Sequence, residues 1–92
     1  MQEKIIYCNY NLFDLHQGIY IHDPKEPGVV TKVAITTLDN LGYTIAEMCD
    51  KYDIYKVRLF GSQAHAESIV DDIQTYALNK YSNKNAIEIE VN

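Results

Sequence analysis

The strongest constraint on the fold is a change of hydrophobic period partway along the chain. Residues 4–13, 18–22 and 29–35 are short runs rich in β-branched and aromatic residues, and the segments between them carry the glycine, proline and aspartate that turns require. From Leu38 onward, apolar residues instead recur every three or four positions, as in an amphipathic helix. A switch from strands to helices within 92 residues predicts a single α/β domain that spans residues 1–92.

The second part of the chain alternates helical and strand-like segments. Helical spacing covers residues 38–52 and 66–81, and the runs at residues 56–60 and 87–91 are strand-like. The predicted order is therefore β-β-β-α-β-α-β. Short turns make the first three strands an antiparallel meander, and each helix then acts as a right-handed crossover into a parallel strand. The simplest result is a five-stranded mixed sheet with the strand order 3-2-1-4-5.

The ends of the two helices can be predicted from capping residues. Thr37 is expected to cap the first helix and Asp53 to end it, and Gly42 within this helix predicts close packing against the sheet. After the fourth strand, Gly61 predicts a tight turn and Ser62 the N-cap of the second helix.

The fourth and fifth strands differ in the burial that their sequences predict. Val57, Leu59 and Phe60 are all expected to be buried, because parallel strands are usually covered on both faces. In the last strand, by contrast, Glu88 and Glu90 alternate with apolar residues. This alternation indicates one face in water and a position near the edge of the sheet.

Charge and composition exclude several classes of protein. The net charge is −5 and the chain has no basic run, which argues against binding of nucleic acid through a Lys/Arg surface. No apolar segment approaches the roughly 20 residues that span a bilayer, so no membrane association is expected. Cys8 and Cys49 occupy positions that suit small buried side chains, and two unpaired cysteines fit a reducing cytoplasm.

The element order resembles the minimal ribonuclease H-like fold, and residues 52–61 resemble the fourth strand of its resolvase-like members. The chemistry of that family implies acidic residues that converge on two metal ions. In this chain the centre of the first strand, around Asn9, has no acid, and Asp14 lies in the following turn. Asp71 and Asp72 lie in mid-helix without a partner acid at the end of the fourth strand. The resemblance therefore implies the fold without catalytic residues, metal or cofactor.

Residues 59–62, Leu-Phe-Gly-Ser, raise an alternative. They resemble the first half of a nucleotidyltransferase motif, in which Gly61 and Ser62 would hold the phosphates of a nucleotide. Ala66 stands where that motif has a second glycine, and no Asp-x-Asp strand follows. A nucleotide-binding enzyme that uses the Gly61–Ser62 turn, either nucleotidyltransferase-like or a degenerate nuclease, remains the alternative to a non-catalytic protein.

Other candidate ligands and nucleophiles lack the necessary spacing. Glu67 and Asp71 are one helical turn apart, but His65 is not at a spacing that joins them. His16 and His22 flank a strand, and nothing in the sequence lowers the pKa of a buried Cys8 thiol. We therefore predict no metal site and no cysteine catalysis.

Tyrosine is unusually frequent, with eight residues in 92. This number exceeds what the core can hide, and surface tyrosine suits recognition. The predicted function is a small cytoplasmic interaction protein without catalytic activity. The size, the composition and the family resemblance suggest a phage protein that binds or inhibits a host protein. A homodimer through the valines of residues 29–33, or through a tyrosine face, is also expected, and a homo-oligomeric structural component is a third interpretation.

Overall fold

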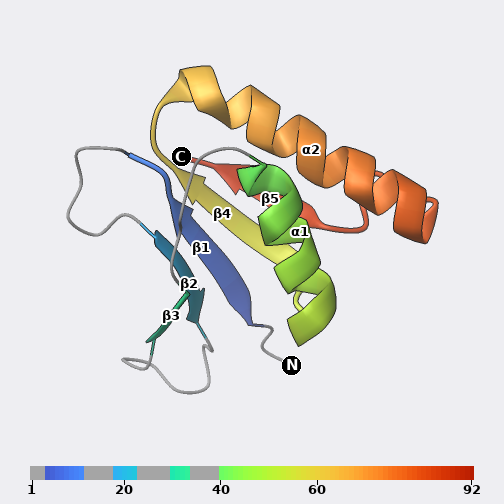
Figure 1. Ribbon diagram of the computed structural model, residues 1–92, viewed down its shortest axis with the longest axis horizontal. Coiled ribbons are helices and arrows are strands. Elements are labelled where there is room, and N and C mark those ends of the chain that lie inside the picture. The colour runs from blue at the N-terminus through green and yellow to red at the C-terminus, as the bar shows by residue number, and fades with distance from the viewer. Residues whose placement is uncertain (1–3, 12–17, 23–29, 34–39) are drawn as a thin grey trace.

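The protein folds as a mixed β-sheet with two helices packed on one of its faces (Figure 1). The computed structural model describes residues 4–11, 18–22, 30–33 and 40–92. The predicted α/β class with a mixed sheet is confirmed. The elements in chain order are β1 (Ile5–Asn9), β2 (Gly18–His22), β3 (Val30–Val33), α1 (Leu41–Tyr52), β4 (Lys56–Phe60), α2 (Gln63–Tyr81) and β5 (Glu88–Val91).

The strands lie in the order β3-β2-β1-β4-β5. β1 pairs antiparallel with β2 and parallel with β4, and β5 lies parallel to β4 at the edge. The register places Cys8 opposite Leu59 and Val57 opposite Ile89. The two helices form the connections into the parallel strands, since α1 precedes β4 and α2 precedes β5.

The core lies between the helices and the sheet. Strand residues contribute to it at every second position, as in Ile6 and Cys8 of β1 and Val57 and Leu59 of β4, all fully buried. The helices contribute stripes at three- and four-residue spacing. In α1 the buried side chains include those of Leu41, Ile45, Met48 and Cys49, and in α2 those of Ala66, Ile69, Ile73 and Ala77.

The expectation that Phe60 is buried in the core is wrong. Phe60 is only half-buried, and it alternates with Val57 and Leu59, so its side chain lies on the other face of the sheet. Its ring stacks on that of Tyr7, with centroids 6.0 Å apart. The prediction failed because the two described helices pack against each other and therefore cover the same face of the sheet, the face that carries Val57 and Leu59 (Figure 1). Neither helix covers the face that carries Phe60.

Two of the three capping predictions, Asp53 and Ser62, are confirmed. Asp53 ends α1 in a left-handed conformation (φ 57°), and its N–H donates to carbonyls of the last turn. Ser62 caps α2, and its hydroxyl accepts a hydrogen bond of 3.2 Å from the N–H of Ala64. Thr37 is not the N-cap of α1, because the helix begins at Leu41 with Asn40 (φ 60°) as the N-cap. Thr37 itself lies outside the described residues.

Gly42 packs closely, but its partner is α2 rather than the predicted sheet. A Cβ atom at this position would lie 2.5 Å from Cβ of Asp72 and 2.7 Å from the carbonyl oxygen of Ile69. No real Cβ atom tolerates such distances, so the missing side chain allows the two helices to approach each other. α2 therefore lies against α1 along the side that carries Ile69 and Asp72.

Candidate functional site

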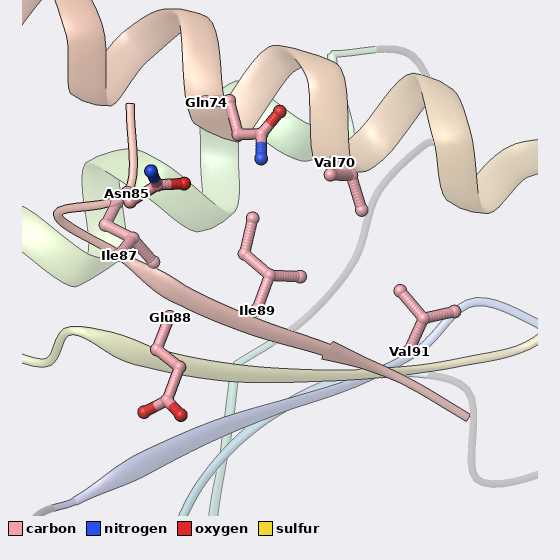
Figure 2. A pocket seen from close by; sticks show the side chains of 7 residues that line it. All are labelled: Val70, Gln74, Asn85, Ile87, Glu88, Ile89 and Val91. Carbon is pink, nitrogen blue, oxygen red and sulfur yellow. The ribbon is translucent and has the colours of Figure 1, made fainter. Parts of the chain in front are cut away.

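A groove open to solvent runs between α2 and the edge strand β5 (Figure 2). It consists of two adjoining depressions of about 330 and 280 Å³, which share Val70, Gln74 and Val91 in their walls. The volume is sufficient for side chains of a partner.

The floor of the groove is apolar because two sequence periods meet there. The alternation in β5 directs Ile89 and Val91 toward α2, and Val70 points from the helix toward the strand (Figure 2). Ala66 precedes Val70 by one helical turn and lines the second depression. Val91 keeps 38% of its surface exposed. The described fold thus leaves apolar surface uncovered at its edge.

The rim of the groove is polar and acidic. Gln63, Glu67, Asp71 and Gln74 line it from α2. Three of the residues that line the groove carry a carboxylate, namely Glu67, Asp71 and Glu88, and none of them is Lys or Arg. The side chain of Glu88 points to the other side of the strand (Figure 2). The groove therefore carries the negative charge of Glu67 and Asp71 along α2, whereas Glu88 lies on the opposite face of the sheet.

Two cations lie on the sheet face opposite the helices, where they engage the acids of β5. Lys56 Nζ lies 3.9 Å from Glu88 Oε2, and Arg58 Nε lies 2.9 Å from Glu90 Oε2. The Glu88 side chain remains 69% exposed, so its ion pair is weak and solvated. Arg58 also lies over the ring of Tyr7 at 5.7 Å. This open face accordingly carries mixed charge, in contrast to the acidic groove.

The outer edge of β5 adds backbone groups to the site. On the inner edge, the N–H of Glu88 donates to the carbonyl of Tyr55 at 2.8 Å, and the N–H of Asn92 donates to that of Leu59 at 2.9 Å. Peptide groups alternate in direction along a strand, so those of Ile89 and Val91 face outward. Within residues 4–11, 18–22, 30–33 and 40–92, β5 pairs with no strand besides β4.

The predicted Gly61–Ser62 turn has the expected local structure. Gly61 follows β4 with a φ of 148°, a value that side chains rarely allow. A Cβ atom on Gly61 would lie 2.6 Å from two carbons of the Tyr10 ring, so this ring fills the space beside the turn. The Ser62 hydroxyl serves as the helix cap. Gly61 and Ser62 therefore both have structural roles, Gly61 in the turn and Ser62 as the cap of α2.

Those acids and histidines considered from sequence that the structure describes are not brought together. Asp71 lines the groove, whereas Asp72 faces Gly42 on the side of α1, and His65 is exposed. Asp14 and His16 lie outside the described residues. Among the residues that the structure describes, no group of three or more His, Cys, Asp or Glu is placed to hold a metal ion. No helix in these ranges is long and apolar enough to cross a membrane.

The cysteines are buried, as the sequence predicts. Both side chains are fully inaccessible, and burial raises the pKa of the Cys8 and Cys49 thiols to about 12. A thiol with so high a pKa is almost entirely protonated at neutral pH and is a poor nucleophile.

The tyrosines divide between core, helix contacts and surface. Tyr10 is buried, and Tyr43, Tyr52 and Tyr55 are each more than a third exposed. Tyr81 packs edge-on against Tyr55, with centroids 5.9 Å apart. The prediction that some tyrosines lie at the surface is confirmed.

The α2–β5 groove was not predicted from sequence. Its signal was the alternation of acidic and apolar residues in residues 87–91, together with the stripe Gln63, Glu67, Val70 and Gln74 on α2. A comparison of the chain with protein-family models, with curated proteins and with solved structures found no match.

Proposed function

We propose that the protein is a non-catalytic interaction protein that binds another protein through the α2–β5 groove. The observation that supports this proposal is an apolar floor left open beside the outer edge of β5, an edge that pairs with no strand of residues 4–11, 18–22, 30–33 and 40–92. Exposed apolar surface with a polar rim is typical of protein-binding sites, and sheet edges are common docking places for extended segments.

The proposal includes the expected origin and fold family. The strand order β3-β2-β1-β4-β5, with two crossover helices, supports a ribonuclease H-like topology. The small size, the acidic composition and this resemblance are the reasons to propose a cytoplasmic phage protein whose partner is a protein of the bacterial host. A bacterial host lysate is therefore the source of candidate partners.

Affinity capture with matched variants tests the function. The tagged protein, Val91→Glu and Leu78→Glu are each incubated with bacterial host lysate, and bound proteins are identified by mass spectrometry. Both substitutions place a carboxylate on an exposed apolar position, but Val91 lines the groove and Leu78 does not. We expect one partner to be retained by the wild type and by Leu78→Glu, and lost by Val91→Glu at unchanged melting temperature. Equal retention by all three would refute the groove as the binding site.

A further inference from the structure

We infer that the groove accepts an extended basic segment of another protein, which adds to the outer edge of β5 as a further strand. This inference deepens the proposed function and rests on it. It names the conformation and the charge of the partner segment, and it can be tested with synthetic peptides.

The first support is the geometry of the edge. The inner edge of β5 is already bonded to β4, whereas the peptide groups of Ile89 and Val91 face outward. An added strand would lie about 4.8 Å beyond β5. The stripe of α2 that lines the groove flanks this position on the helix side. An extended chain can therefore satisfy the edge while its side chains enter the groove.

The second support is the two-faced surface that such a strand would meet. Toward α2 it would contact the apolar side chains of Val70, Ile89 and Val91 (Figure 2). Toward the opposite face it would lie next to Glu88, which points away from α2 (Figure 2), and next to Glu90, which is paired with Arg58. Because side chains alternate along a strand, the matching sequence alternates apolar residues with Lys or Arg.

The third support is charge. Glu67 and Asp71 stand on the rim, and the lining residues include no cation. Glu88 is 69% exposed and only loosely paired with Lys56, so it remains available to an incoming cation. Opposite charges across adjacent strands are stabilising. The occupant therefore carries positive charge.

The same charges disfavour a second copy of this chain as the occupant. Antiparallel pairing of two β5 strands about Ile89 would place Glu88 of one copy opposite Glu90 of the other. Like charges directly opposite each other destabilise a sheet. Each chain also carries a net charge of −5, which adds long-range repulsion.

The test uses a short capped peptide that alternates Lys and Val, titrated into the full-length ¹⁵N-labelled protein. Three control peptides accompany it. One alternates Glu and Val, and the other two are Lys–Val peptides N-methylated either on every Lys or on every Val, so that in each of them one edge of the strand cannot donate hydrogen bonds. We expect saturable shifts at β5 and slower hydrogen exchange of the Ile89 and Val91 amides. The Glu–Val peptide should bind at least about tenfold more weakly than the Lys–Val peptide. The same loss is expected for the methylated peptide that lacks N–H groups on the edge facing β5.

A charge variant checks the role of Glu88. Glu88→Gln should weaken the Lys–Val peptide by roughly two- to fivefold, because Glu88 lies on the face that the lysines would occupy, and Glu47→Gln on the exposed side of α1 should leave its affinity unchanged. The inference is overturned if the Lys–Val peptide does not bind, if the Glu–Val peptide binds equally well, or if neither methylated register weakens binding. Self-association of the free protein that Val91→Glu abolishes would instead identify a second copy as the occupant.

The outcomes separate this inference from the proposed function. If Val91→Glu loses a cellular partner but no peptide binds, the groove is an interaction site for something other than a basic strand. If the peptide binds as expected but capture is unaffected by Val91→Glu, strand addition occurs and the proposed cellular role of the groove is wrong.

Discussion

Asp50 near the end of α1 accepts a hydrogen bond of 2.7 Å from the hydroxyl of Tyr81, the last residue of α2. Lys80 Nζ lies 2.5 Å from the other carboxylate oxygen of Asp50. The hydrogen bonds from Lys80 and then Tyr81 lower the pKa of Asp50 below its ordinary 3.8, and the partnership with Asp50 raises that of Lys80. The contacts join the two helices at the end opposite to Gly42.

Acid should weaken this connection. A carboxyl group with a lowered pKa contributes stability that is complete above its unfolded pKa and is lost as the pH falls through its folded pKa. Asp50→Asn should therefore melt below the wild type at neutral pH, and the gap should narrow as the pH falls below 3.8. Melting temperatures across this pH range test the prediction, with Glu47→Gln on the same helix as the control. A gap that stays constant would show that the charge of Asp50 contributes nothing.

Gly61 should tolerate no larger residue. A side chain there would combine the strain of a φ of 148° with overlap of the Tyr10 ring. We expect Gly61→Val to cost roughly 2–5 kcal/mol of unfolding free energy, measured by denaturant titration. Because Gly61→Val could fail to fold, a milder double-mutant cycle measures the cost of Gly61→Ala both in the wild type and in the Tyr10→Leu variant. The cost of Gly61→Ala should be smaller in the Tyr10→Leu background, and equal costs would contradict the ring contact.

Ser62 separates the structural role of its turn from nucleotide binding. Loss of the cap in Ser62→Ala should cost about 1 kcal/mol and lower the melting temperature by roughly 4–8 °C. Ser68→Ala, an exposed serine farther along the same helix, should have little effect. ATP or GTP with magnesium should not stabilise the wild type. A nucleotide at a hundred times its dissociation constant would add about 2.7 kcal/mol to the free energy of unfolding. If the wild type gained this stability and a folded Ser62→Ala variant did not, the enzyme alternative would be supported.

The two thiols should react only when the protein opens. Cys8 and Cys49 are fully buried, and their pKa of about 12 leaves a negligible thiolate fraction at neutral pH. A chromogenic disulfide reagent should modify neither residue in native protein and both in denaturant. Rapid modification of either thiol under native conditions would contradict their burial.

A homodimer remains a prediction. β3 (Val30–Val33) forms the edge of the sheet opposite to β5, and valine-rich edges invite pairing. We expect sedimentation velocity at high micromolar concentration to show a dimer that Val30→Lys weakens. A monomer at that concentration would count against this prediction without affecting the groove, which lies at the other edge.

The sequence alone determined the features that depend on neighbouring residues. The period of residues 38–52 and 66–81 predicted two helices, although the first begins at Leu41 rather than at the start of its pattern. Ser62 and Asp53 were identified as caps because capping uses hydrogen bonds within a few residues along the chain. The α/β class followed from the order of these local elements.

The tertiary structure decided how these elements meet. Whether Phe60 is covered, and whether Gly42 faces the sheet or a helix, depends on the face of the sheet over which both crossovers run. The groove has the same origin: α2 lies close to α1 through Gly42, and β5 ends the described sheet, so apolar residues that alternate like core residues stay open to solvent. No periodicity in the chain specifies this outcome, because it arises from the positions of segments distant in sequence.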